Sequence, residues 1–415
     1  MPSLSSLPRP NPARLAVRIT PDALRRVRAG HPWVFDESVT AVNHEGRAGD
    51  LAVVFDADRK FAAIGLWDPT SPIRLKVLHQ GRPVTIDRAF WAARLATALA
   101  RRAPLIAGDD TTGYRVLNGE NDGFPGLVLD LYDHTLVIKL YSAVWIAHLA
   151  DLVPVIEEAL HPDALVLRLS RSLSAATSPA ELYGLEEGDA LTGTSPDTPV
   201  LFRECGLTFE ADVVHGQKTG HYLDQRDNRA LAASMAAGAR VLDVFSSTGG
   251  FTVHAAAGGA REVVAIDLSA PTLAVAGRNL AHNGALPAVA ACAYRPIVGD
   301  AFHEMNRLAT NGERFDMVII DPPSFAQRQL NVPRALSAYG RLTDIAVKLV
   351  KRDGLLVQCS CSSRVSADQF HTTVVRSAAG AGRPLDILRR TGHGLDHPVT
   401  FPEGEYLKAV FARVP

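Results

Sequence analysis

One short apolar run and the glycine-rich turn after it constrain this chain more than any other stretch. Residues 241–245 are predicted to form a buried strand, because the run is short, apolar and ended by serine and glycine. Residues 246–250 then turn into a predicted helix over 251–257, and a second strand ends at Asp267. An acid about 20 residues after a glycine-rich turn is what nucleotide-binding βαβ units require. We expect the glycines to let backbone approach a ligand and Asp267 to accept hydrogen bonds from ribose hydroxyls.

The composition is that of a large globular chain. Its 415 residues allow two or three domains, and 47% hydrophobic residues can bury a large core. A net charge of −1 argues against a wholly basic nucleic-acid binder and leaves room for a local basic face. The four cysteines lack C-x-x-C spacing and no apolar run reaches membrane-spanning length, so we expect reduced thiols, a cytoplasmic location, no metal and no membrane. Residues 1–12, rich in Pro and Ser, are predicted to be a disordered tail.

Residues 13–80 are predicted to form a small β-barrel, because short apolar runs alternate there with turn signals. These runs cover residues 15–19, 51–55, 61–66 and 73–78. A helix predicted over residues 22–29 is rich in arginine and leads into His31-Pro32-Trp33-Val34-Phe35. One interpretation is a solvated helix face with Trp33 in the core, and the other is a phosphate-binding patch beside an aromatic side chain. The second would place Arg25, Arg26, His31 and Trp33 against RNA.

Residues 81–190 are predicted to form an α+β domain. Its helices are expected over residues 88–102 and 146–160, and its strands over 127–132, 135–141 and 164–169. The polar stretch 114–127 is predicted to be a long loop, which either touches a substrate or only joins two strands. Residues 191–213 are predicted to form a connecting hairpin that turns at Cys205-Gly206.

Strands and helices alternate over residues 214–415, which predicts a mainly parallel, doubly wound sheet. Ligands bind such sheets at the carboxyl ends of the strands. Five chemically capable side chains fall near that edge, and these are Asp243, Asp267, Asp300, Asp321 and Cys361. The run from His215 to Arg229, just before the first strand, is either a charged connector or a further part of a ligand site. We interpret the five side chains as members of one site.

The loop Asp321-Pro322-Pro323-Ser324-Phe325 follows a fully apolar predicted strand over residues 315–320. It resembles motif IV of the class I S-adenosylmethionine-dependent methyltransferases that act on nucleic-acid bases, and it is not a feature of NAD enzymes. Two prolines stiffen the loop and hold Asp321 toward the edge of a base. Phe325 is predicted to stack on a base that has been flipped out of its helix.

Cys361 is the second indication of nucleic-acid chemistry. Side chains alternate along a strand, so Cys361 shares one face with Leu355, Val357 and Cys359. Of these residues Cys361 lies nearest the active edge, and Cys359 lies deeper and is predicted to be a packing residue. Packing is the simplest interpretation of Cys361 too. The serines around it, at positions 360, 362 and 363, favour a polar opening instead.

A thiolate at this edge would solve a chemical difficulty, because C5 of cytosine is a poor nucleophile. Addition of the thiolate at C6 makes C5 enamine-like, so that it can attack the methyl group of S-adenosylmethionine. An acid near N3 stabilises the developing charge, a base removes the C5 proton, and the thiolate leaves. We assign Cys361 as the nucleophile and Asp321 as the acid.

From about residue 13 the chain resembles the PUA-domain-containing bacterial 23S rRNA (cytosine-5-)-methyltransferases. The motifs that carry the resemblance are residues 31–35, 118–127, 218–229, 245–251, 321–325, 359–363, 396–398 and 401–404. The resemblance implies a Rossmann-like class I methyltransferase domain after a PUA-like β-barrel and a central α+β domain. It also implies S-adenosylmethionine as cofactor, a cytosine of 23S rRNA as target and large-subunit rRNA as partner, and it leaves a homodimer open.

The site residues follow from these motifs. Those expected at the cofactor are Lys218, Tyr222, Gln225, Asp243, Phe245, Ser246, Thr248, Gly249, Gly250, Asp267 and Asp300. Those expected at the substrate, besides the four near the first helix, are Pro322, Pro323 and Phe325.

Three positions depart from the family pattern: Ser247 replaces an aromatic residue, Ser324 a frequent lysine and Ser363 a glycine. They bear on substrate placement and leave the nucleophile in place. Two other functions stay open, which are methylation of an exocyclic amine of guanine or adenine, where no covalent adduct is needed, and non-catalytic RNA binding in ribosome assembly. A small-molecule methyltransferase would not need the PUA-like domain.

Overall fold

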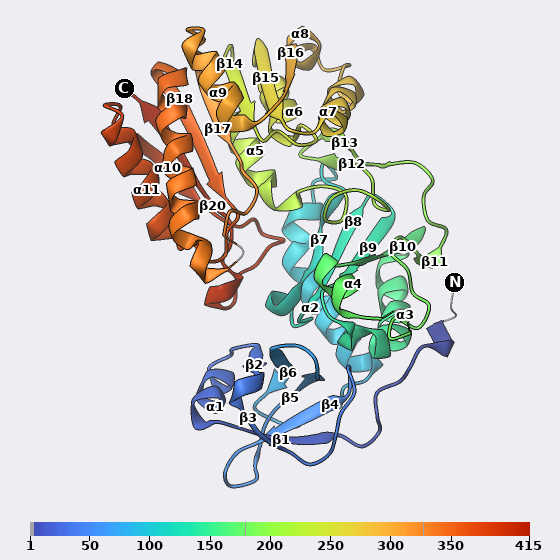
Figure 1. Ribbon diagram of the computed structural model, residues 1–415. Coiled ribbons are helices and arrows are strands. Elements are labelled where there is room, and N and C mark those ends of the chain that lie inside the picture. Colours follow the sequence, from blue (N-terminus) through green and yellow to red (C-terminus); the bar gives the residue numbers. More distant parts are fainter. Residues whose placement is uncertain (1–3, 179, 327) are drawn as a thin grey trace. The chain divides into compact units, whose positions relative to one another are not determined.

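The computed structural model describes residues 4–178, 180–326 and 328–415 in two compact units (Figure 1). The first unit comprises Met1–Phe202, Ala211–His221 and Leu395–Phe401, and the second comprises Arg203–Glu210, Tyr222–Gly394 and Pro402–Pro415. The domain boundaries expected near residues 80, 190 and 213 stay predictions.

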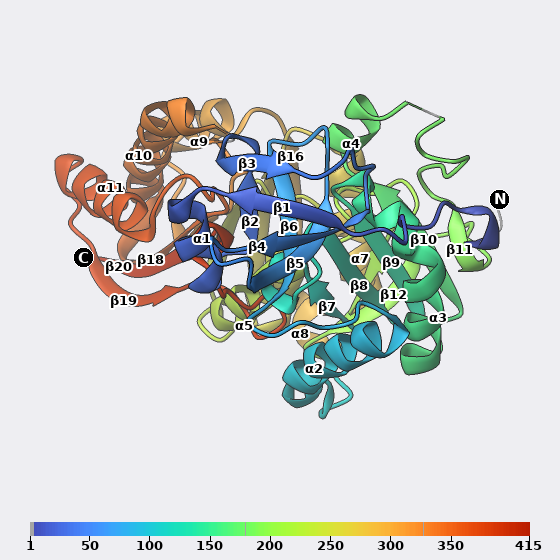
Figure 2. The same ribbon diagram turned by 90° about the horizontal axis from the view of Figure 1, so that it is seen from below.

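The first unit begins with a six-stranded sheet in the order β2-β6-β5-β4-β1-β3. The strands are β1 Leu15–Ile19, β2 Trp33–Phe35, β3 Val39–Val42, β4 Leu51–Phe55, β5 Phe61–Trp67 and β6 Ile73–Gln80. β1 and β4 are parallel, and the other pairs are antiparallel; Figure 2 shows β1, β4 and β5 side by side. Helix α1, Pro21–Arg28, starts where the Thr20 hydroxyl accepts a hydrogen bond from Ala23 N. The four predicted strands and the helix are confirmed, and β2 and β3 are additional.

The two faces of this sheet lie in different cores. On one face Leu15, Val17 and Val54 pack with Ala23 and Val27 of α1. The opposite face, which we call the outer face, contributes several residues to the core of the following module, and these are Leu51, Val53, Ile64, Leu66 and Leu78. The alternation of strand side chains therefore divides each strand between the two cores.

That module contains a five-stranded sheet in the order β11-β10-β9-β8-β7. Its strands are β7 Gly113–Asn118, β8 Leu127–Tyr132, β9 Thr135–Leu140, β10 Ala164–Leu169 and β11 Ala190–Gly193. The main helices are α2 Arg88–Ile106 and α3 Leu149–Leu160, with the short α4 Arg171–Ala176 and the 3-10 turns Gly119–Asp122 and Ala143–His148. The expected loop over 114–127 is wrong in its first part, because β7 occupies residues 113–118 and pairs with β8.

The expectation of disorder over residues 1–12 is also wrong for the part that the structure describes. Leu4–Ser6 form a 3-10 turn, and Leu7 is 4% exposed in the core of the first unit. Asn11 N donates a hydrogen bond to Asp50 Oδ1, so tertiary contacts fix a segment whose composition suggested none. Residues 1–3 lie outside the described residues.

The hairpin predicted over residues 191–213 consists of β12 Val200–Glu204 and β13 Leu207–Ala211. Its turn is at Cys205 and Gly206, whose φ angles are +51° and +77°, as expected.

The second unit contains a seven-stranded sheet in the order β16-β15-β14-β17-β18-β20-β19. The strands are β14 Arg240–Val244, β15 Glu262–Asp267, β16 Ala293–Val298, β17 Phe315–Ile320, β18 Val350–Ser360, β19 Asp386–Thr391 and β20 Lys408–Val414. β16, β15, β14, β17 and β18 are parallel, whereas β20 is antiparallel to both its neighbours. The predicted mainly parallel, doubly wound sheet is confirmed.

Helices cover both faces of this sheet (Figure 1). α9 Ala301–Thr310, α10 Val332–Leu349 and α11 Ala367–Gly380 bury their apolar residues on one face. α5 Arg226–Ala233 and α6 Gly250–Ala257 contribute to the core on the other, and α7 Ala270–His282 and α8 Pro287–Ala291 lie against α6.

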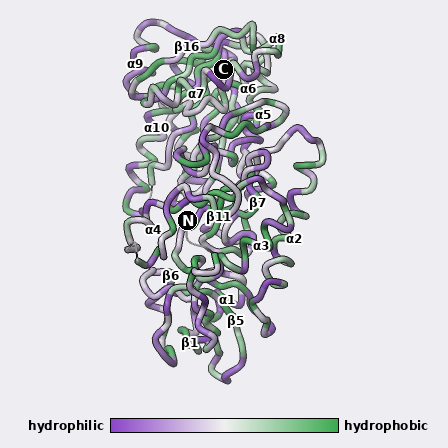
Figure 3. The backbone as a smooth tube through the Cα atoms, turned by 90° about the vertical axis from the view of Figure 1, so that its right-hand side faces the viewer, coloured by the Kyte–Doolittle hydropathy of each residue, from purple (hydrophilic) through white to green (hydrophobic). Residues whose placement is uncertain are grey.

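Hydrophilic and hydrophobic residues are interspersed along the chain in Figure 3. Within the described ranges, no helix is both long and apolar enough to cross a membrane.

Candidate functional site

The glycine-rich turn after β14 has a backbone that favours glycine. Phe245, Ser247 and Gly249 have φ angles of +64°, +48° and +80°. Gly249 also packs against α7, because a Cβ added there would lie 2.6 Å from Ala276 Cβ. A side chain at this position would push the helix away, so the turn presents bare backbone at the carboxyl end of β14.

Buried Arg229 supports this turn. Its Nη1 donates hydrogen bonds of 2.9 and 3.0 Å to the two carboxylate oxygens of Glu204, and its Nη2 donates one of 2.7 Å to the Tyr222 carbonyl oxygen. A Cβ added to Gly250 would lie 2.4 Å from Arg229 Nε. Gly250 and Tyr222, both expected at the cofactor, are therefore fixed by one guanidinium, and their contact with a cofactor stays a prediction.

Asp243 is fully buried on β14, where the Thr252 hydroxyl donates a 2.7 Å hydrogen bond to Oδ2. Oδ1 has no hydrogen-bond partner among the described residues. Burial raises the pKa of Asp243 to about 7, and the negative charge of Asp321 adds to the rise. The carboxyl group therefore titrates near neutral pH and keeps one oxygen for a ligand.

Asp267, at the end of β15, joins two turns at the same edge. Its Oδ2 accepts a 2.9 Å hydrogen bond from Ser247 N, and its Oδ1 accepts one of 2.9 Å from Ser269 N. Oδ1 also accepts a 3.3 Å hydrogen bond from Thr272 Oγ1, whereas Oδ2 retains acceptor capacity, so this half-buried group can still bind a hydroxyl donor. Asp300 is exposed and accepts from His303 N as the N-cap of α9. Its expected contact with an adenine amino group stays a prediction.

Three further residues expected at the cofactor lie in or beside the same turn. Phe245 is half-buried, and Ser246 is buried and donates a 3.4 Å hydrogen bond to the Ile266 carbonyl oxygen. The Thr248 carbonyl oxygen accepts 2.9 Å from Asn279 Nδ2 of α7. The turn is thus anchored to β15 and to α7.

Gln225 contacts the predicted acid rather than the glycine-rich turn. Its Nε2 donates a 2.8 Å hydrogen bond to Asp321 Oδ1, while Asn228 Nδ2 donates 2.6 Å to its Oε1. Gln225 therefore orients the Asp321 carboxylate. Lys218 belongs to the first unit, where its carbonyl oxygen accepts 2.8 Å from Lys139 Nζ, and its role at a cofactor stays a prediction.

The loop after β17 is held close to β14. Asp321 N donates a 3.2 Å hydrogen bond to the Val244 carbonyl oxygen. Pro322 is buried and Pro323 exposed. Phe325 is half-buried, and its ring centroid lies 5.2 Å from that of Tyr339. The ring thus already has an aromatic neighbour, and its stacking on a base stays a prediction.

Cys361 directly follows β18 and is half-buried. Its Sγ lies 3.7 Å from the Pro322 carbonyl oxygen, because β17 and β18 are parallel neighbours whose carboxyl ends meet. The sequence predicted this proximity of Cys361 to the Asp321 loop. Cys359 is fully buried and burial raises its pKa well above normal, which confirms it as a packing residue.

The expectation that the serines around Cys361 form a polar opening is wrong for Ser360 and Ser362. Ser360 and Ser362 are fully buried, and both hydroxyls hydrogen-bond to the Tyr339 hydroxyl, at 2.8 and 2.9 Å. Ser362 Oγ also lies 3.2 Å from Ser324 Oγ. This hydroxyl cluster, Ser324, Tyr339, Ser360 and Ser362, links the two loops that carry Asp321 and Cys361. Only Ser363 is exposed.

Lys408 is a site residue that sequence reasoning missed. It is 2% exposed at the start of β20, and its Nζ donates hydrogen bonds of 2.6 Å to the carbonyl oxygens of Ser362 and Val365. Burial lowers the pKa of Lys408 to about 8. A single lysine before the apolar run of β20 was the signal that could have indicated it.

The residues expected to contact RNA lie in the first unit. Arg25 and Arg26 are exposed on α1, and Arg25 forms an exposed ion pair with Asp22. Their contact with RNA stays a prediction.

Trp33 fits neither of the two interpretations completely. It is half-buried, its Nε1 donates a 2.9 Å hydrogen bond to Glu120 Oε1, and its ring packs edge-on against Phe401 at 5.0 Å. His31 packs edge-on against the rings of both Trp33 and Phe401. The His31–Phe35 stretch therefore joins the six-stranded sheet to residues 119–122 and 395–401 of the same unit.

Two regions of the chain match known protein families. A family model described as S-adenosylmethionine-dependent methyltransferase matches residues 188–409, and one described as a PUA-like domain matches residues 17–80. A methyltransferase solved with SAH, SMU.776, has a TM-score of 0.81 at 19% identity, over 96% of this chain and all of that one, which supports the fold alone.

Two curated relatives align over nearly the whole length. A ribosomal RNA large subunit methyltransferase of Deinococcus radiodurans is 46% identical over 99% of this chain and 100% of its own. A ribosomal RNA large subunit methyltransferase I of Alteromonas mediterranea is 35% identical over 96% of this chain and 98% of its own. The chain therefore belongs to the family of S-adenosylmethionine-dependent methyltransferases with a PUA-like domain in which the ribosomal RNA large subunit methyltransferases are found.

Proposed function

We propose that this protein methylates C5 of a cytosine in 23S ribosomal RNA through a covalent adduct with Cys361. The observation that carries the proposal is the 3.7 Å approach of Cys361 Sγ to the Pro322 carbonyl oxygen, which puts the thiol beside the Asp321 loop at the carboxyl edge of the sheet. The relatives named for large-subunit ribosomal RNA support the substrate class. Substrate contacts are proposed for Pro322, Pro323 and Phe325, and for Arg25, Arg26, His31 and Trp33 on the first unit.

The residues at this edge fit S-adenosylmethionine. The unpartnered Oδ1 of buried Asp243 can accept from a ligand N–H or O–H, the half-buried carboxylate of Asp267 suits ribose hydroxyls, and the turn at Gly249 leaves no side chain in the way. When bound, this cofactor supplies an electrophilic methyl group. We propose that Asp243, Asp267 and the turn over residues 245–250 hold it, with Lys218, Tyr222, Gln225 and Asp300 as further contacts.

The protein's own residues then divide the chemistry between two loops. The Cys361 thiolate adds to C6 of the cytosine, which makes C5 nucleophilic. Asp321, oriented by the Gln225 amide, supplies a proton near N3 and stabilises the charge that develops there. After C5 has taken the methyl group, a base removes the C5 proton, the C5–C6 double bond re-forms as the thiolate leaves, and N3 returns its proton to Asp321. The hydroxyl cluster holds both loops at a fixed separation during these steps.

Replacement of the thiol tests the proposal. Cys361→Ala is expected to abolish methyl transfer to ribosomal RNA while S-adenosylmethionine still binds, measured by titration calorimetry. Cys292→Ala is the matched control, because Cys292 is also half-buried and its Sγ has a similar weak contact, 3.7 Å from the Ala293 carbonyl oxygen. Full activity of Cys361→Ala would indicate methylation of an exocyclic amine. Mass-spectrometric mapping of rRNA from cells with and without the protein would identify the methylated nucleotide.

A further inference from the structure

Part of the outer face of the six-stranded sheet is not covered by the rest of the first unit. Its β4, β5 and β6 residues pack into the large core, as Val53, Ile64 and Leu78 do. Toward the β1 and β3 side the same face carries Arg18 and Ala41, which are exposed. The sheet therefore has an accessible strip at β4, β1 and β3.

Two adjoining hollows lie on this strip, and each has a volume of about 380 Å³. The first is lined by Arg14, Leu15, Ala16, Val53, Phe55, Phe61 and Pro83. The second is lined by Ala16, Val17, Arg18, Ala41, Val42, Asn43, Phe55 and Arg59. Ala16 and Phe55 line both, so the hollows form one continuous surface, which we call the Phe55 surface.

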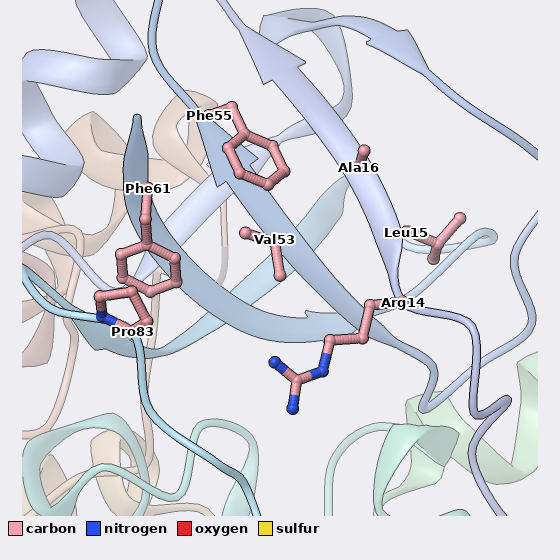
Figure 4. A pocket seen from close by; sticks show the side chains of 7 residues that line it. All are labelled: Arg14, Leu15, Ala16, Val53, Phe55, Phe61 and Pro83. Atoms are coloured by element: carbon pink, nitrogen blue, oxygen red, sulfur yellow. The ribbon is translucent and has the colours of Figure 1, made fainter. Parts of the chain in front are cut away.

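Two aromatic rings form part of the floor and side of this surface. Phe55 and Phe61 are register partners in the antiparallel pairing of β4 with β5, so their side chains project from the same face. Both are half-buried. Figure 4 shows the two rings on neighbouring strands, with Val53 beside them and Arg14 extending toward the same hollow.

Three arginines surround the rings without ion pairs. Arg14, Arg18 and Arg59 are exposed, and none forms a salt bridge with any residue in the described ranges. By contrast, Arg28 of α1 is paired with Asp56 and Arg74 of β6 with Asp36. Asp58 is the exposed acid in the turn beside Arg59. The surface therefore has a local excess of positive charge in a chain whose net charge is −1.

We propose that the Phe55 surface binds an unpaired segment of the substrate RNA, with bases stacked on Phe55 and Phe61 and phosphates at Arg14, Arg18 and Arg59. Aromatic faces beside unpaired cations are the combination with which proteins hold single-stranded nucleic acid. A purely apolar protein partner would not use three guanidinium groups. The surface lies on the face of the sheet opposite to α1, so it is separate from the contacts proposed for Arg25 and Arg26. The inference rests on the proposed function in one respect, that the substrate is RNA.

The test uses the full chain and fluorescence anisotropy with a labelled single-stranded RNA of mixed sequence, about 10 nucleotides long. Phe55→Leu and Phe61→Leu keep apolar volume and remove the π face, and each is expected to weaken binding by roughly fivefold or more. Arg18→Gln and Arg59→Gln are each expected to lower the magnitude of the slope of log K against log salt by about 0.7. A duplex of the same sequence is expected to lose affinity only in the arginine variants.

Tyr183→Leu and Arg376→Gln are the controls, because both side chains are exposed and lie outside this surface. They are expected to bind RNA as the parent does. Unchanged RNA affinity and salt slope in all four surface variants would overturn the proposal. The proposal would also be overturned if the surface variants bound RNA normally but were no longer retained on ribosomal particles. That result would assign the surface to a protein partner. Failure of the cytosine chemistry would appear separately, as full activity of Cys361→Ala with RNA binding intact.

Discussion

Lys408 Nζ donates a 2.6 Å hydrogen bond to the carbonyl oxygen of Ser362, the residue directly after Cys361. Its second bond, to Val365, places one buried ammonium across the loop that carries the proposed nucleophile. Lys408→Met would keep the aliphatic stem and remove the donors from two buried carbonyls. We expect the free energy of unfolding to fall by about 2–4 kcal/mol, measured by urea denaturation, and methyl transfer to slow at least about tenfold, because a loosened loop misplaces the thiol.

Lys351→Met is the matched control for this change, since Lys351 pairs with Asp316 on the same sheet but is half-exposed. It is expected to cost at most about 1 kcal/mol. Equal losses for the two variants would show that Lys408 does not hold the loop.

Asp243 gives a prediction about pH. Burial raises its pKa to about 7 in the folded protein, from 3.8 for a free side chain. Between these values the folded state binds more protons than the unfolded state, so this group's contribution to stability is present below about pH 4 and is lost as the pH rises to 7. Asp243→Asn cannot titrate. We therefore expect the unfolding free energy of Asp243→Asn to rise relative to that of the parent by roughly 4 kcal/mol between pH 4 and pH 8. A pH-independent difference between the two proteins would contradict the assignment.

The Tyr339 hydroxyl is predicted to matter for activity through the hydroxyl cluster. Tyr339→Phe keeps the ring packing and removes the group that bonds to Ser360 and Ser362. A loss of about 1–2 kcal/mol in unfolding free energy is expected, because two buried serine hydroxyls lose a partner, together with slower methyl transfer. Tyr294→Phe removes a hydroxyl whose one hydrogen bond within the described ranges is to the Leu273 carbonyl oxygen, at 3.2 Å, and it should leave methyl transfer unchanged. Equal activities of the two variants would exclude a role for the cluster.

The proximity of Cys361 to the loop that carries Asp321 could be predicted from the sequence because local patterns were sufficient. Each follows an apolar run, and the carboxyl ends of neighbouring parallel strands share one edge. The bond from Lys408 to Ser362 could not be predicted in this way. It depends on β20 pairing antiparallel with β18 so that Lys408 faces Ser360, a register that no local pattern encodes.

Tertiary packing likewise decided the segments that were predicted wrongly. β7 lies within a polar stretch that contains glycine, and its pairing with β8 makes it a strand. Leu7 is buried by the core of the first unit, although the residues around it are typical of a tail. Ser360 and Ser362 suggested solvent by their polarity, but Tyr339, about 20 residues away in the chain, satisfies their hydroxyls.

Gly249 provides the sharpest test of the glycine-rich turn. Its φ of +80° and the 2.6 Å approach of an added Cβ to Ala276 both oppose a side chain, so Gly249→Ala must strain the turn or displace α7. The expected results are a loss of about 2–3 kcal/mol in unfolding free energy and a weaker affinity for S-adenosylmethionine, measured by titration calorimetry. Gly380→Ala is the control, because Gly380 ends α11 with open space around its added Cβ, and it should gain up to about 1 kcal/mol. If Gly249→Ala binds the cofactor as tightly as Gly380→Ala does, the turn after β14 does not form the cofactor site.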